Sequence, residues 1–167
     1  MMRFFLINEE SSRRRKLSII ITEKSINMNT NYNLDSSVKS HFLNLFSIAL
    51  SDSTMDPVEL KMLYNIGLEK GIKKEEVDFI INNPHKVRFY KPVTILESID
   101  QLYDLVRMVL ADGVIDPREL TVCSTIAEKL GFQKENIPDL VDFLIEEERK
   151  NTPKDELISK IRNTIKQ

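Results

Sequence analysis

The sequence predicts an all-α protein, a single compact bundle of about seven helices. Of its 167 residues, 41% are hydrophobic and 30% are charged, an ordinary balance for a globular protein. Only four glycines and six prolines are present, too few for a sandwich of many tightly turned strands. Long stretches rich in Leu, Ile, Glu and Lys carry apolar residues three to four positions apart, which indicates amphipathic helices.

Start and stop signals divide these stretches into helices. The globular part begins near residue 35, where three good N-cap residues precede helical spacing. Pro84 disfavours helix at the residue before it and ends the third helix. Thr94 and Glu97 form a capping-box pattern before the fourth helix, whose apolar residues cover most of its girth, as in a buried central helix. The expected helices span about residues 38–51, 57–71, 73–81, 95–110, 117–130, 138–150 and 153–166.

One stretch occurs twice, at an offset of 60 residues (112 − 52 = 60). Residues 52–60 read DSTMDPVEL and residues 112–120 read DGVIDPREL. The surrounding residues keep this offset, so that Leu45 pairs with Leu105 and Gly71 with Gly131. We therefore expect two pseudo-repeated three-helix units, at about residues 38–83 and 98–143, which bury their apolar faces against each other.

Residues 1–34 lack this helical pattern. They hold two short strand-like runs, at 3–7 and 17–22, and a polar, Asn-rich stretch. Two isolated strands are marginal, so we expect a flexible or loosely docked N-terminal extension before a helical domain at residues 35–167. We also hypothesise that the natural start is Met28, which peptides from residues 1–27 in the natively expressed protein would refute.

Charge and composition exclude several classes of function. A net charge of −2 and a pI near 5.8 give no electrostatic basis for nucleic-acid binding. The single Cys123 cannot form an internal disulfide, which fits a reducing compartment. No apolar run approaches the ~20 residues that span a bilayer. We expect a cytoplasmic protein without a membrane span, a prediction compatible with a membrane-associated partner.

The doubled stretch has a structural and a functional interpretation. Asp56, Pro57 and Glu59 fit the N-cap, first and third positions of a helix, and Asp116, Pro117 and Glu119 repeat that pattern. A calcium-binding EF-hand is disfavoured, because its first ligand positions would be apolar helix residues. Asp52 and Asp112 precede the caps by four residues. They either close the interhelical turns through backbone N–H groups or pool their carboxylates into an acidic site.

Other residues offer weaker candidates. His41 pairs with Gln101 at the offset of 60, so the second copy has no histidine there. Cys123 pairs with Leu63 and is expected in the core. No nucleophile, P-loop or dinucleotide motif is present. The irregular link near residues 85–93 sets basic side chains around two aromatic ones and is a candidate partner-binding segment. Its candidate residues are Lys86, Arg88, Phe89, Tyr90 and Lys91.

The second copy resembles a known family. Residues 109–120, VLADGVIDPREL, followed by IAEKLG at residues 126–131, are similar to the tellurite-resistance TerB family, and the resemblance covers about residues 38–166. The first copy departs from the A-D-G pattern, with Ser51-Asp52-Ser53. The resemblance implies an all-helical, TerB-like domain without enzymatic activity, linked to chemical stress. It also implies acidic metal ligands, which here would be Asp52, Asp56, Glu59, Asp112, Asp116 and Glu119.

Two functions are therefore expected. The first is a non-enzymatic stress-response domain that binds a divalent cation or a basic partner protein through an acidic surface. The second is a metal-free protein–protein adaptor, like the related domains of J-domain co-chaperones, which docks its partner at a groove or at the basic link.

Overall fold

The computed structural model describes residues 34–165 except residues 52 and 54. The chain divides into two units, residues 1–33 and residues 34–167. The strand-like runs, Met28 and the expected state of the N-terminal extension therefore lie outside the described residues.

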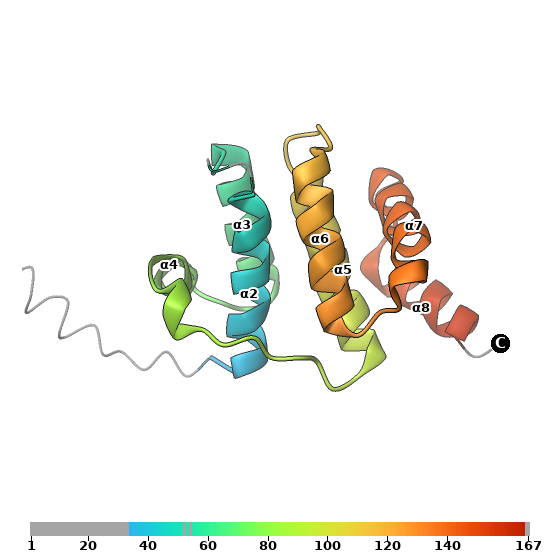
Figure 1. Cartoon of the computed structure of the whole chain (residues 1–167), viewed down its shortest axis with the longest axis horizontal. Coiled ribbons are helices and arrows are strands. Elements are labelled where there is room, and N and C mark those ends of the chain that lie inside the picture. The colour runs from blue at the N-terminus through green and yellow to red at the C-terminus, as the bar shows by residue number, and fades with distance from the viewer. Residues whose placement is uncertain (1–33, 52, 54, 166–167) are drawn as a thin grey trace, which may run out of the picture. The chain divides into compact units, whose positions relative to one another are not determined.

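The described residues form seven α-helices and no strand, which confirms the all-α prediction for this part of the chain (Figure 1). There are also two short 3-10 helices among the described residues. The first, η1 (Pro84–Lys86), lies at the start of the link to α5, and the second, η2 (Lys134–Asn136), directly precedes α7. The helices are α2 (Ser36–Ala49), α3 (Pro57–Glu69), α4 (Lys74–Asn82), α5 (Ile95–Val109), α6 (Pro117–Leu130), α7 (Ile137–Arg149) and α8 (Lys154–Ile165).

The predicted helix ends agree with the observed capping contacts. Asp35 caps α2 by accepting a hydrogen bond from the Ser37 N–H. Thr94 and Glu97 form the expected capping box at the start of α5. Gly131 ends α6 in the left-handed region, with φ of 106°, where a residue without Cβ is favoured. Local sequence therefore determines where these helices begin and end.

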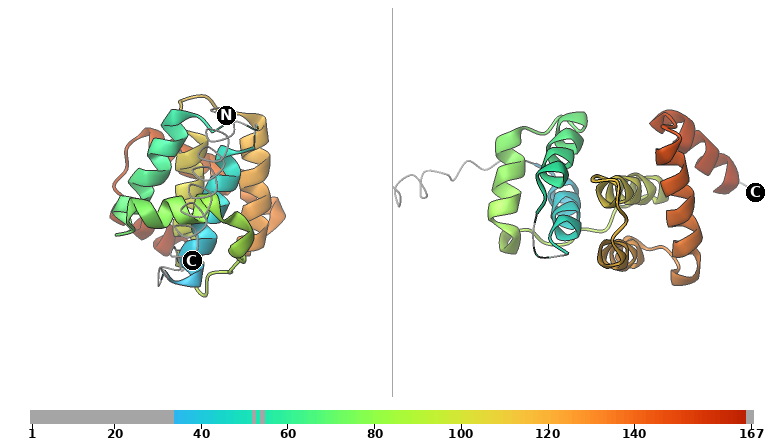
Figure 2. Two further views of the ribbon diagram at one scale, coloured as in Figure 1. Left: turned by 90° about the vertical axis from the view of Figure 1, so that its left-hand side faces the viewer. Right: turned by 90° about the horizontal axis from the view of Figure 1, so that it is seen from above.

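Helix α5 is the central helix, as its broad apolar face predicts. It packs against α2, α3, α6 and α7, and the right-hand view of Figure 2 shows α5 and α6 in a middle layer, between α2 and α3 on one side and α7 on the other. Its buried residues join those of the other helices in one core. The largest fully buried side chains include Phe42, Leu45, Leu102, Leu105 and Leu144.

The two motif turns lie at one end of the helices and the basic link at the other. The turns join α2 to α3 and α5 to α6, both at the upper end in Figure 1. The link between α4 and α5 runs along the lower end. Its Tyr90 N–H donates a hydrogen bond to Ser40 Oγ on α2 at 2.8 Å, which attaches the link to the bundle.

Candidate functional site

In the first motif copy, both cap carboxylates stabilise the start of a helix. The Val58 N–H donates to Asp56 Oδ1 at 2.7 Å, and the Asp56 N–H donates to Glu59 Oε2 at 2.7 Å. This is a complete capping box. Glu59 is 6% exposed, so little of its carboxylate faces solvent. The structural interpretation of Asp56 and Glu59 is confirmed.

In the second copy, Asp116 caps α6 in the same way. The Arg118 N–H donates to Asp116 Oδ1 at 2.7 Å, and the Arg118 guanidinium lies 2.7 Å from Oδ2. The hydrogen bond from the Arg118 side chain, followed by the one from its backbone N–H, lowers the pKa of Asp116 to about 2. Glu119 is buried at the start of the same helix. The Asp116 carboxylate is thus engaged within its own helix turn.

Asp112 closes its turn through the backbone. The Val114 N–H donates to Asp112 Oδ1 at 2.8 Å, the local contact expected of a turn aspartate. Gly113 follows with φ of 82°, and Ser53 has φ of 76° at the corresponding place in the first copy. Both residues donate their N–H to the last turn of the preceding helix, to Leu110 O and Leu50 O. Ser53 therefore adopts the conformation that glycine adopts in the second copy.

The motif carboxylates form no metal cluster among the described residues. No group of three or more His, Cys, Asp or Glu side chains that could hold a metal ion occurs in the part of the chain that the structure describes. Asp52, the sixth predicted ligand, lies outside the described residues. The other five are Asp56, Glu59, Asp112, Asp116 and Glu119, in the helix-start and turn positions given above.

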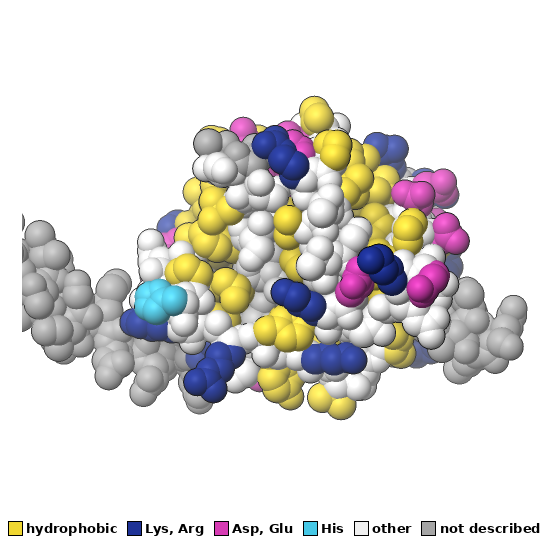
Figure 3. Space-filling model, viewed as in Figure 1, with side chains coloured by type: hydrophobic (Ala, Val, Ile, Leu, Met, Phe, Trp, Pro, Cys, Tyr) yellow, Lys and Arg dark blue, Asp and Glu magenta, His cyan; other side chains and the backbone are white. Residues whose placement is uncertain are grey.

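The basic link presents both charge and apolar surface. Lys86, Arg88 and Lys91 are exposed, and none forms an ion pair with another described residue. Phe89 and Tyr90 are 43% and 42% exposed. Lys and Arg side chains alternate with hydrophobic ones along the lower edge of Figure 3, where this link runs. The five residues predicted from the sequence thus belong to one exposed segment.

An apolar groove begins at the first residue of α5, which follows the link in the sequence. It has a volume of about 440 Å³ and lies between the start of α5, helix α7 and helix α8. Ile95, which lines the groove, and Val93, the last residue of the link, are both exposed apolar residues. The groove is lined by Ile95, Ile99, Phe132, Asn136, Asp139, Leu140, Phe143 and Ile161. Concave, mostly apolar pockets of this size are where proteins commonly bind ligands.

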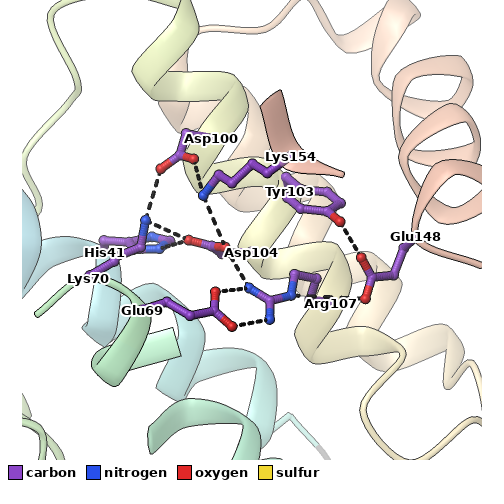
Figure 4. Close-up of polar contacts among 9 residues, drawn as sticks. All are labelled: His41, Glu69, Lys70, Asp100, Tyr103, Asp104, Arg107, Glu148 and Lys154. Carbon is purple, nitrogen blue, oxygen red and sulfur yellow. Dashed lines mark hydrogen bonds and ion pairs between the residues drawn. The ribbon is translucent and has the colours of Figure 1, made fainter. Parts of the chain in front are cut away.

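A buried charge cluster centred on Asp104 was not predicted from the sequence. The side chain of Asp104 is fully buried on α5, and its Oδ2 lies 2.9 Å from both His41 Nε2 and Lys70 Nζ. Arg107 lies 3.4 Å from Oδ1, and Lys154, at the start of α8, lies 3.9 Å away (Figure 4). One carboxylate therefore connects α5 to α2, to the end of α3 and to α8.

Further ion pairs surround this carboxylate. Arg107 binds Glu69 through two parallel hydrogen bonds of 2.7 Å, and Lys70 lies 2.9 Å from Asp100. Asp100 also binds Lys154, and Tyr103 donates a hydrogen bond to Glu148 on α7. Bidentate and charge-assisted bonds are the stronger kinds of hydrogen bond. The cluster therefore joins α5 to α2, to the end of α3, to α7 and to α8.

The cluster sets the protonation of its members. Burial alone would raise the pKa of Asp104, but the His41 hydrogen bond and the charges of Lys70 and Lys154 hold it well below its usual value. Burial opposes the charge of Lys70, yet Asp104 and Asp100 raise its pKa. Asp104 therefore stays ionised although it is fully buried.

Cys123 is a core residue, as predicted. It is 0% exposed on α6, and burial raises the pKa of its thiol to about 12. A thiol that stays protonated is a poor nucleophile. Cys123 therefore contributes packing.

Comparisons with known protein families, with curated proteins and with solved structures find no match to this chain. Across the described residues, no helix combines the length and the apolar character that crossing a membrane requires.

Proposed function

We propose that the helical domain is a protein-interaction module that binds an acidic, apolar segment of a partner protein. The observation that carries this proposal is an exposed segment with three cations and two aromatic side chains that leads, within four residues of Lys91, to Ile95 at the apolar groove. Binding requires no metal and no catalytic residue.

The charges on the link define the chemistry of the partner. Three exposed cations without an ion-pair partner among the described residues attract an acidic segment and orient it before contact. Phe89 and Tyr90 supply aromatic surface, which is enriched at protein interfaces. The groove then accepts apolar side chains, as in complexes where an amphipathic helix lies in a hydrophobic groove.

A selection from a random peptide library tests this proposal. We expect the purified domain to enrich peptides that combine Asp or Glu with large apolar residues, and higher salt to weaken their binding. The double variant Lys86→Glu and Lys91→Glu should lose that binding, because two attractive charges become repulsive. The matched control is Lys61→Glu with Lys129→Glu, which changes charge equally at exposed positions on α3 and α6.

Two outcomes would contradict the proposal. One is enrichment of basic or uncharged peptides. The other is equal loss of binding in the link variant and in the control variant, which would show an effect of net charge alone.

Divalent-metal binding at the motif turns is the second candidate function. It is favoured by the position of both turns at the same end of the helices and by the exposure of Asp112. The resemblance to the TerB family, with two pseudo-repeated three-helix units, supports it. In both units a helix beginning at proline, Pro57 or Pro117, follows the motif's cap residue.

Calorimetric titration with calcium, magnesium and zinc separates the two candidates. If the turns bind metal, we expect heat of binding that disappears in the Asp52→Ala, Asp112→Ala double variant, because each change removes oxygen ligands. Absence of heat with all three ions would eliminate this second candidate and leave peptide binding unaffected. A metal-dependent stress function, such as tellurite resistance, would require that the turns bind metal in this titration.

A further inference from the structure

The apolar groove carries one charge of its own. Among the described residues that line it, Asp139 alone is charged, six are apolar, and Asn136 is a neutral amide. Asp139 is exposed in the first turn of α7 and forms no ion pair with another described residue. In a mostly apolar site, a few polar groups fix the orientation of what binds. A segment that lies in this groove therefore meets one negative charge.

A positive charge lies next to the groove in space. A Cβ atom on Gly131 would lie 2.6 Å from Lys91 Nζ and 2.8 Å from Lys91 Cε, so the end of the Lys91 side chain lies against Gly131. Gly131 is the C-cap of α6, where the helix dipole favours a cation. The next residue, Phe132, lines the groove. The Lys91 ammonium of the basic link therefore adjoins the chain segment that forms this side of the groove.

These two opposite charges do not neutralise each other. Neither Lys91 nor Asp139 forms an ion pair with any described residue, and so none joins them. They also belong to different parts of the groove, because Lys91 adjoins the end of α6 whereas Asp139 lies on α7, beyond η2. Both charges therefore remain available to a bound segment.

We propose that the partner segment carries opposite charges at its two ends. Its acidic end lies at Lys91 and the rest of the basic link, its apolar side chains fill the groove, and a Lys or Arg beyond them pairs with Asp139. This inference rests on the proposed interaction function and adds to it the basic residue of the partner and the direction in which the segment lies.

The pair at Asp139 provides selectivity more than affinity. An exposed ion pair changes affinity by about fivefold at most. A segment bound in the opposite direction would place its acidic end at Asp139 and its basic end at Lys91, so that like charges face each other twice. Complementary charges fix the register of a complex, and like charges exclude the wrong one.

Three peptide libraries of equal length test the proposal. All share the same randomised apolar centre and blocked termini, and they carry Glu at one end and Lys at the other in both orders, Glu at both ends, or Lys at both ends. We expect the immobilised full chain to retain the Glu–Lys library most. The Glu–Glu library should be retained about threefold less, because its second carboxylate meets Asp139. The Lys–Lys library should be retained least.

Reversing the charge in the groove should reverse this preference. In Asp139→Lys, the Glu–Glu library is expected to become the preferred one, and the milder Asp139→Asn should retain the Glu–Lys and Glu–Glu libraries equally. The matched control is Asp142→Lys, which makes the same change at an exposed position on α7 that does not line the groove. This control should keep the preference for the Glu–Lys library.

The possible failures are distinguishable. Equal retention of the Glu–Lys and Glu–Glu libraries by the unmodified chain would overturn the inference and leave the proposed function standing. The same holds for an unchanged preference in Asp139→Lys, or for an equal change in Asp142→Lys. Retention of no library, or of the Lys–Lys library most, would contradict the proposed function as well. A dimer of the unmodified chain that Ile95→Asp dissociates would assign the groove to a second copy and also overturn the inference.

Discussion

Replacing Asp104 with asparagine is expected to lower the free energy of unfolding by about 3–5 kcal/mol, the usual cost of breaking a buried ion pair by removing one partner. The variant keeps the size of the side chain but leaves His41 and Lys70 without the carboxylate that lies 2.9 Å from each. Domains are stable by only about 5–15 kcal/mol in total. Chemical denaturation with constant m-value would measure the loss.

Asp100→Asn provides the matched control on the same helix. Asp100 also binds two lysines, but its side chain is 30% exposed, whereas that of Asp104 is 0% exposed. Water screens the more exposed pairs, so we expect a loss of about 1 kcal/mol or less. Equal losses in the two variants would show that burial of the Asp104 carboxylate does not set its importance.

The same carboxylate makes stability depend on acid pH. The folded-state pKa of Asp104 lies below its unfolded value of about 3.9. The stabilisation is therefore fully present above that unfolded value and is lost as pH falls toward the folded pKa. Below pH 4, the free energy of unfolding of Asp104→Asn should therefore fall less steeply with decreasing pH than that of the unmodified protein. Denaturation curves at several pH values would detect this difference.

Much of the fold could be predicted from the sequence because helix ends depend on nearby residues. Asp56 and Thr94 cap their helices through contacts within three positions, and Gly131 ends α6 by its own backbone conformation. The period of apolar residues likewise identifies α5 as central. These signals need no knowledge of distant parts of the chain.

The buried charge cluster could not be predicted in the same way. His41 and Asp104 are 63 positions apart, and Lys70 and Lys154 come from other elements again. From the sequence alone, a charged residue within a helix is normally assigned to the solvent-exposed face. The available signal was the position of Asp104 among the apolar residues of α5, where an ionised side chain requires partners. The packing of the helices decides which side chains supply them.

Leu105→Ala is expected to lower the free energy of unfolding by about 2–5 kcal/mol, because it removes a side chain from the centre of the core and leaves a cavity. Leu105 is 0% exposed on α5, and so is Leu45, its counterpart on α2 at the offset of 60. Leu45→Ala should cost a similar amount, because Leu45 is equally buried and the hypothesis of two pseudo-repeated units makes the two positions equivalent. Leu68→Ala, at 78% exposure, should change stability by about 0.5 kcal/mol or less. Thermal and chemical denaturation of the three variants would measure these costs, and a small loss in Leu45→Ala beside a large one in Leu105→Ala would contradict the equivalence.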